Sequence, residues 1–172
     1  MASLMEDFMD ILDKENSEYQ ILLELSKKKT PVIIKGDVQE LQKITDEEQI
    51  VVDRVSHLDR KREETLNDIA NVINKDVETL KIPVLIKLLQ SRPKEARQLS
   101  KIHDALKETL GELVRINDQN RELIKQSLEM VEFDLNLVQA MRQAPVTGNY
   151  DRGAYNAGNV MGPENAGFDA KQ

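Results

Sequence analysis

The chain has 172 residues, of which 32% are charged and only 3% are aromatic, and it contains neither Cys nor Trp. This length suits one domain, and the absence of cysteine excludes disulfides, thiolate metal sites and cysteine nucleophiles. The formal net charge of −7 argues against a nucleic-acid-binding protein, which usually carries a basic face.

The N-terminal stretch MASLMEDFMDILDKE is acidic, and its apolar residues are periodic. A secretory signal would instead have a positively charged start and a continuous apolar core. No apolar run approaches the roughly 18 residues that indicate a transmembrane helix. We therefore expect a cytoplasmic protein without a transmembrane segment, and the lack of cysteine fits a reducing compartment.

Apolar residues spaced by three or four positions predict a first helix over residues 3–30. Ser3 is a suitable N-cap, and the cations of Lys27–Lys29 lie in the last turn, where they complement the helix dipole. Pro31 is expected to end or kink this helix, because proline removes an intrahelical donor and clashes with the preceding turn.

The clearest helix boundary lies in the sequence KGD at residues 35–37. Gly36 fits the C′ position of one helix, Asp37 fits the N-cap of the next, and Glu40 completes a capping-box-like pattern. A second helix is predicted over 38–74. Its apolar residues follow the three-and-four spacing of coiled coils: Leu41, Ile44, Val51, Val55, Leu58, Ile69 and Val72.

The apolar connector after the second helix predicts a short helix over 79–90, with Pro83 close to its first turn. Pro93 then fits the first position of a third long helix, 93–142. The fold expected is all-α: an antiparallel, coiled-coil-like bundle of three long helices plus a short connecting helix.

We expect residues 1–144 to form this helical bundle domain and residues 145–172 to form a flexible tail rich in Gly and Asn. The tail has no apolar periodicity. It is predicted to be disordered because it cannot bury enough surface to offset the entropy lost on ordering.

Helix length predicts that the third long helix extends past its neighbours. At a rise of about 1.5 Å per residue the three helices span roughly 45, 55 and 75 Å. Short connections make neighbouring helices antiparallel. The third helix should therefore extend about 20 Å beyond the turn at Gly36–Asp37, over residues 130–142.

The same segment is apolar on two sides. One set of side chains shares one side of the helix: Leu128, Val131, Leu135 and Val138. A second set clusters roughly 150° away: Met130, Phe133, Leu137, Ala140 and Met141. A helix with two apolar faces needs two neighbours. One interpretation is a foreign partner, and the other is a second copy of the chain or the first helix reaching this far. The residues alone do not decide between these two interpretations.

No pattern in the sequence indicates catalysis or a metal or cofactor site. His57 and His103 are preceded at three residues by Arg54 and Ser100, so the Glu-x-x-His pairs of di-iron bundles are absent. We therefore expect a protein that is not an enzyme and has no cofactor.

Three polar residues interrupt the apolar spacing of the third helix: Asn117, Asn120 and Ser127. A buried Asn in a helical interface sets its register. The alternative, slightly favoured by their place near the end of the bundle, is that they face solvent.

Three stretches resemble the FlgN family, the flagellar export chaperones of the hook-filament junction proteins. They are KGDVQELQKITDEEQ (35–49), INDQNRELIKQSLEMVEFDLNLV (116–138) and NYDRG (149–153). The middle stretch carries the most specific ordered combination: Asn117, Asn120, Ser127, Leu128, Val131, Phe133, Leu135, Asn136 and Leu137. Pro31 departs from the smooth helix expected of the family, and residues 154–172 match nothing in it.

The resemblance implies a cytoplasmic chaperone that holds the C-terminal amphipathic helices of FlgK and FlgL. It would prevent their premature assembly and deliver them to the flagellar type III export apparatus, with an export-gate component as a possible further partner. Tyr150 falls where the family's tail tyrosine motif is expected. The expected partner-binding residues are Leu123, Ser127, Leu128, Met130, Val131, Phe133, Leu135, Leu137, Val138, Met141 and Tyr150.

The alternative function is a non-catalytic coiled-coil adaptor, in which the extra apolar stripe closes a homodimer. A helical-bundle enzyme is a third class, and it would need a metal or nucleotide site that the sequence does not indicate.

Overall fold

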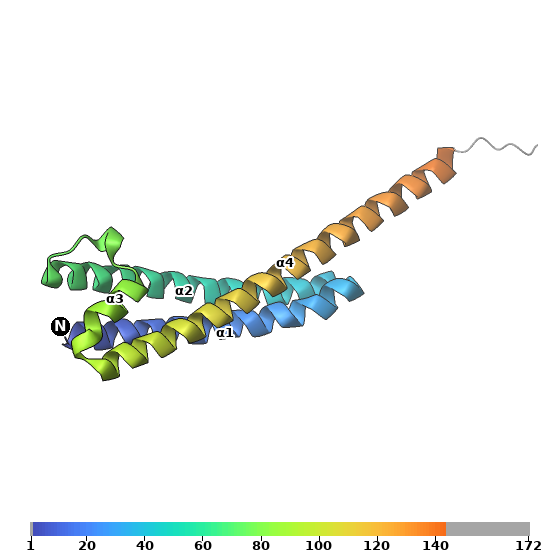
Figure 1. The fold of residues 1–172 in the computed structure, drawn as a ribbon. Coiled ribbons are helices and arrows are strands. Elements are labelled where there is room, and N and C mark those ends of the chain that lie inside the picture. The colour runs from blue at the N-terminus through green and yellow to red at the C-terminus, as the bar shows by residue number, and fades with distance from the viewer. Residues whose placement is uncertain (1, 144–172) are drawn as a thin grey trace, which may run out of the picture. The chain divides into compact units, whose positions relative to one another are not determined.

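The computed structural model describes residues 2–143 of the chain. The predicted tail, 145–172, and Tyr150 lie outside the described residues. The described elements, which include no strand, are α1 (Ala2–Lys35), α2 (Val38–Ile73), the 3₁₀ turn η1 (Val77–Thr79), α3 (Ile82–Leu88), the 3₁₀ turn η2 (Leu89–Ser91) and α4 (Pro93–Gln143) (Figure 1). The prediction of an all-α fold with three long helices and a short connecting helix is confirmed.

The chain divides into two units, Met1–Val131 and Glu132–Gln172, which are described separately. The first unit contains α1, α2, the connector and most of α4. The described part of the second unit is the last stretch of α4. The predicted domain boundary at 144/145 lies outside the described residues and stays a prediction.

Polar contacts give the directions of the long helices in the first unit. Three ion pairs join α1 to α2: Glu15–Arg62, Glu18–Arg54 and Lys29–Glu48. Partner numbers fall in α2 as they rise in α1, so these two helices are antiparallel. Ser26 and Thr30 of α1 bond to Asn117 and Asn120 of α4, so α1 and α4 are parallel.

The turn between α1 and α2 follows from three residues. Gly36 adopts φ +69°, a left-handed conformation that glycine accepts without a Cβ penalty. Its N–H donates to the carbonyl of Ile33 at 3.0 Å, and the N–H of Asp37 donates to the carbonyl of Val32 at 3.2 Å, which is the Schellman pattern. The Asp37 carboxylate then accepts from the N–H of Glu40 at 3.0 Å. The predicted helix boundary at this turn is found.

The predicted end of the first helix near residue 30 is wrong, because α1 continues through Pro31 to Lys35. Proline removes only its own N–H from the helical ladder, and one missing bond does not force the chain out of the helix. The last turn of α1, after Pro31, is stabilised by the burial of Ile33, which is 5% exposed, and by the hydrogen bonds that end the helix at Gly36.

The connector also differs from its prediction as one helix over 79–90. Asp76 caps the η1 turn by accepting from the N–H of Glu78 at 3.1 Å, and α3 starts only at Ile82, with Pro83 in its first turn. Lys81, just before α3, is extended, and Pro83 lies in the first turn, where its missing N–H removes no intrahelical hydrogen bond, so the proline is compatible with a start at Ile82. Near the end of α2 the predicted Ile69 is buried, whereas the predicted Val72 is 54% exposed and Ala70, which was not predicted, is buried.

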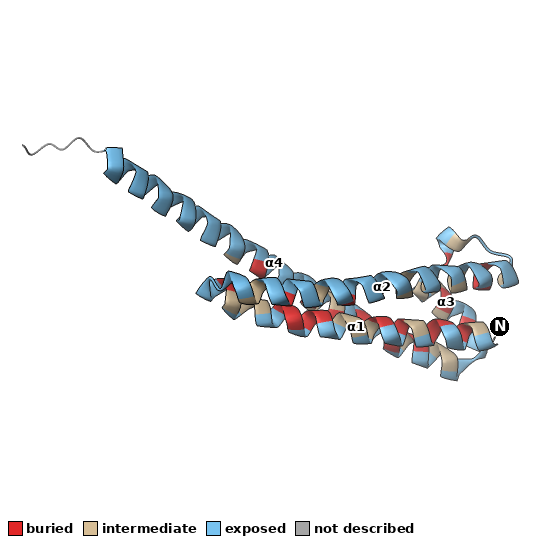
Figure 2. Cartoon of the chain, turned by 180° about the vertical axis from the view of Figure 1, so that it is seen from behind, coloured by how far each residue is buried: buried red, intermediate tan, exposed pale blue. Residues whose placement is uncertain are grey.

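Two apolar clusters form the core of the first unit (Figure 2). The first joins α1, the end of α2, the connector and the start of α4. Its most completely buried side chains are Phe8, Leu12, Ile69, Leu85 and Leu99. The second lies further along α1 and comprises Leu22, Leu23, Leu25, Ile44, Val51, Leu113 and Ile116. The core therefore runs along α1, between α2 and α4.

A buried ion pair lies between α1 and α2. Glu15 is 3% exposed, and its Oε1 lies 3.1 Å from Nε of Arg62, although the two atoms are outside hydrogen-bond geometry. Arg62 also pairs with Asp59. Burial raises the pKa of the Glu15 carboxyl above its usual value, and Asp59 adds to this effect while Arg62 opposes it.

Leu12→Ala should lower the free energy of unfolding by about 2–5 kcal/mol, because it leaves a cavity in the first cluster. The same change at the exposed Leu128 should alter it by less than about 0.5 kcal/mol. Urea unfolding followed by circular dichroism measures both. A similar loss in both variants would contradict the exposure of Leu128.

Glu15→Gln should change how stability depends on pH. The folded pKa of Glu15 lies above its usual value of 4.5, so the folded chain holds this proton more tightly than the unfolded chain does. The resulting stabilisation is fully present below about pH 4.5 and is lost as pH rises through the folded pKa. The variant cannot ionise, so its free energy of unfolding relative to wild type should rise between about pH 4.5 and 7. Urea titrations across this range test the trend, and a constant or falling difference contradicts it.

Candidate functional site

The last part of α4 has no buried side chain. Asn120 is the last buried residue of this helix in the described chain, and every residue from 124 to 143 is exposed (Figure 2). Nine large apolar side chains in this stretch are between 37% and 71% exposed: Ile124, Leu128, Met130, Val131, Phe133, Leu135, Leu137, Val138 and Met141. Isolated exposed apolar residues are ordinary in proteins, but a continuous set of this kind indicates an interaction surface.

The expected partner-binding residues fall into four groups. Leu123 is half-buried. The hydroxyl of Ser127 donates to the carbonyl of Leu123 at 2.9 Å, so it is used within its own helix. Tyr150 lies outside the described residues. The remaining eight are exposed along α4: Leu128, Met130, Val131, Phe133, Leu135, Leu137, Val138 and Met141.

An apolar pocket lies at the end of the first unit where α1 turns into α2. Its volume is about 260 Å³. The lining comes from the end of α1, the start of α2 and one side of α4: Val32, Ile33, Gly36, Asp37, Val38, Leu41, Ile124, Ser127, Leu128 and Val131. The structure thus brings three of the expected residues, Ser127, Leu128 and Val131, together with residues of α1 and α2 that the sequence did not single out.

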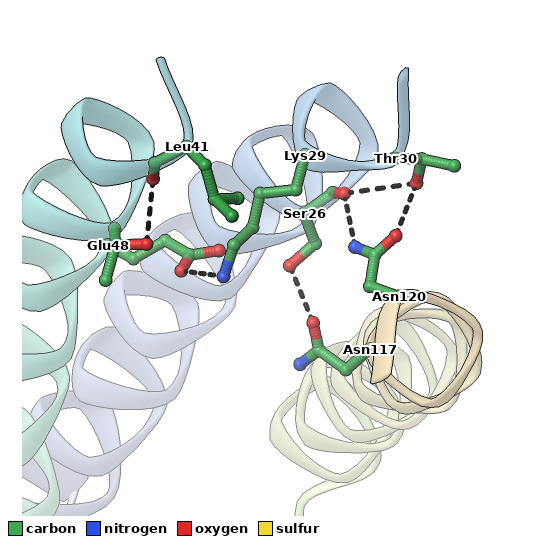
Figure 3. Close-up of polar contacts among 8 residues, drawn as sticks. Ser26, Lys29, Thr30, Leu41, Glu48, Asn117 and Asn120 are labelled. Carbon is green, nitrogen blue, oxygen red and sulfur yellow. Dashed lines mark hydrogen bonds and ion pairs between the residues drawn. The ribbon is translucent and has the colours of Figure 1, made fainter. Parts of the chain in front are cut away.

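Hydrogen bonds fasten α4 to α1 just before the exposed stretch. The Thr30 hydroxyl donates to Oδ1 of Asn120 at 2.7 Å, and Nδ2 of Asn120 donates to the Ser26 carbonyl at 2.8 Å (Figure 3). The Ser26 hydroxyl donates to Oδ1 of Asn117 at 2.8 Å. Both polar atoms of the buried Asn120 are therefore satisfied within the first unit.

These contacts decide between the two interpretations of the polar residues in α4, a buried position in the interface and a position facing solvent. Asn120 is 4% exposed and hydrogen-bonded to α1, whereas Asn117 and Ser127 are exposed. The solvent-facing interpretation is wrong for Asn120 and holds for Ser127, while Asn117 is exposed and also accepts a hydrogen bond from Ser26 of α1. Ser26 and Thr30 were not predicted as partners, because nothing in the local sequence connects them with residues some ninety positions away.

A second pocket, of about 430 Å³, lies beside this hydrogen-bonded patch. Lys29 and Glu48, on its α1 and α2 sides, form an ion pair of 2.6 Å (Figure 3). On its α4 side it reaches Ile124, which also lines the apolar pocket. The two pockets therefore adjoin along α4.

Within residues 2–143, no group of three or more His, Cys, Asp or Glu residues is placed to hold a metal ion. Nδ1 of His103 lies 3.4 Å from the carboxylate of Asp104. No helix among the described residues is both long and apolar enough to cross a membrane.

Comparisons with known proteins agree with the family resemblance of the three sequence stretches. A protein of Bacillus subtilis (strain 168) described as "Uncharacterized protein YvyG" is 21% identical over 120 residues, which cover 70% of this chain and 71% of that protein. No solved structure matches the chain. The family model described as "FlgN protein" matches residues 1–157, which is most of the chain. The chain therefore belongs to the FlgN family.

Proposed function

We propose that the protein is a cytoplasmic export chaperone that holds the C-terminal amphipathic helices of FlgK- and FlgL-type hook-filament junction proteins. It prevents their premature assembly and delivers them to the flagellar type III export apparatus. A role as a flagellar chaperone follows from membership of the FlgN family. The identity of the clients, the cytoplasmic location and the delivery to the export apparatus are what we propose beyond this.

The observation that carries the proposal is the exposed apolar surface of α4 between Ile124 and Met141. An amphipathic helix is recognised by a complementary apolar surface, on which its own apolar face becomes buried. A client segment of this kind would otherwise expose that face and associate with copies of itself. Covering it is the physical basis of preventing premature assembly.

The composition of the surface suits more than one client. Met130 and Met141 have flexible, polarizable side chains that adjust to different shapes at small cost, and Phe133 adds a large rigid contact. Surfaces rich in methionine are typical of proteins that bind several partners. This favours two related clients over a single one.

The energetics require a client that covers much of the surface. Burying each large apolar side chain contributes about 1.5–3 kcal/mol, while association costs about 4–15 kcal/mol in lost freedom. A contact limited to two or three of these side chains is therefore too weak. Stable binding needs most of the nine exposed residues.

Replacing both Phe133 and Leu137 with Asp should weaken binding of a C-terminal FlgK or FlgL fragment at least about a hundredfold, because two buried apolar contacts are lost. The helical content should stay nearly unchanged, since both side chains are exposed. Isothermal titration calorimetry and circular dichroism measure the two quantities.

The matched control is the pair Ile50→Asp and Val72→Asp, which places the same substitution at exposed apolar residues of α2. This control should bind like wild type. If the Phe133/Leu137 variant also binds like wild type, the site is misassigned. A tight wild-type dimer that the Phe133/Leu137 variant dissociates, in sedimentation at low micromolar concentration, would instead favour the homodimeric adaptor.

A further inference from the structure

The methionines among the described residues divide into a buried pair and an exposed pair. Met5 and Met9 of α1 are 5% and 3% exposed and belong to the first apolar cluster. Met130 and Met141 of α4 are 62% and 71% exposed. The other two methionines of the chain are outside the described residues. Two methionine side chains are thus shielded from solvent, and two are open to it.

Methionine supplies all the sulfur of this chain, because the sequence contains no cysteine. A chain of this kind has no thiolate that would react with an oxidant in place of the thioethers. Its response to oxidants that attack sulfur therefore depends on its methionines.

Hydrogen peroxide converts a methionine thioether into a sulfoxide. A lone pair of the sulfur attacks one peroxide oxygen, and the O–O bond breaks as the S–O bond forms. The sulfur is oxidised by two electrons, and the peroxide is reduced. The proton of the transferred oxygen passes to the departing hydroxide, which leaves as water. Methionine sulfoxide reductases reverse the change, so the modification is not permanent.

Burial decides which methionines react first, because the oxidant must reach the sulfur. Met5 and Met9 become accessible only when the first apolar cluster opens, and the rarity of such opening slows their reaction. Met130 and Met141 need no opening, since neither is buried. The fold therefore directs peroxide to the two methionines of α4.

Oxidation of these two residues changes the chemistry of the exposed apolar surface of α4. A sulfoxide is polar, and burying it against an apolar partner costs free energy unless the partner supplies a hydrogen-bond donor. The other large apolar residues of this surface are Ile, Leu, Val and Phe, which carry no sulfur. Each oxidised methionine thus removes one of the apolar contacts on which the proposed client binding depends.

We infer that Met130 and Met141 are sites of reversible oxidation by peroxide, and that their oxidation weakens client binding. This inference rests on the proposed function and adds a regulation of the same surface. The flexible side chains that let the surface adjust to different clients are also the ones that peroxide makes polar.

Peptide mapping by mass spectrometry tests the selectivity. The folded full-length chain is treated with hydrogen peroxide for increasing times and then digested. Sulfoxide should appear on Met130 and Met141 at least about tenfold faster than on Met5 and Met9, because only the latter require local opening. The control is the same treatment in urea, in which all four should react at similar rates. Equal rates in the folded chain overturn the inference.

Calorimetry with a C-terminal junction-protein fragment tests the effect on binding. Wild type that carries sulfoxide at both positions should bind at least about tenfold more weakly than untreated wild type. Treatment with methionine sulfoxide reductases should restore the affinity. The matched variant combines Met130→Leu and Met141→Leu, which keep apolar side chains of similar volume without sulfur. Its affinity after peroxide, compared with that of its own untreated sample, should stay constant.

The outcomes separate this inference from the proposed function. Unchanged binding by oxidised wild type overturns the inference and leaves the proposed function standing. A peroxide-dependent loss in the leucine variant, or a loss that circular dichroism shows to accompany unfolding, places the effect elsewhere in the chain and also overturns it. Failure of untreated wild type to bind the fragment overturns the proposed function and the effect on binding together, while peptide mapping still decides whether the two methionines are the oxidation sites.

Discussion

The exposed surface depends on the place where α4 loses contact with α1. Asn120 is the last buried residue of α4 in the described chain, and its amide bonds to Thr30 and to the Ser26 carbonyl of α1. A buried amide left without partners costs about 1–3 kcal/mol, so sliding α4 along α1 by one turn is unfavourable. The register of the two helices is thereby set. In that register every residue of α4 from 124 to 143 is exposed.

Polar contacts specify register elsewhere along the same bundle. An apolar stripe with three-and-four spacing repeats every seven residues. Such a stripe determines which faces of two helices meet, but it does not determine how far one helix is shifted along the other. The buried pair of Glu15 with Arg62 and the ion pair of Lys29 with Glu48 tie α1 to α2 at two separate levels. Removing one partner of a buried pair leaves an uncompensated charge, which penalises any shifted packing. Each neighbour of α1 is thus aligned by polar side chains within an otherwise apolar interface.

Features governed by local chemistry could be predicted from the sequence, and those governed by distant contacts could not. The turn at Gly36–Asp37 was predicted because its glycine and its capping carboxylate lie within a few residues of each other. The end of α1 was not, because packing of Ile33 outweighs the helix-breaking tendency of Pro31. The exposed residues of α4 follow from helix length and apolar spacing, both of which the sequence contains. The burial of Asn120, in contrast, depends on side chains of α1 some ninety residues away.

The exposed stretch of α4 is helical although none of its residues is buried, and its composition explains why. Residues 124–143 contain no Gly or Pro and are rich in Glu, Gln, Leu and Met, which have high helix propensity. The costly step of starting a helix is also absent here, because the preceding turns are already held in the bundle and each added residue only extends them. A surface that is helical before binding loses less conformational freedom when a partner docks, which increases affinity. Packing of the earlier turns of α4 in the bundle thus stabilises the helical conformation of the exposed stretch, which itself makes no contribution to the core.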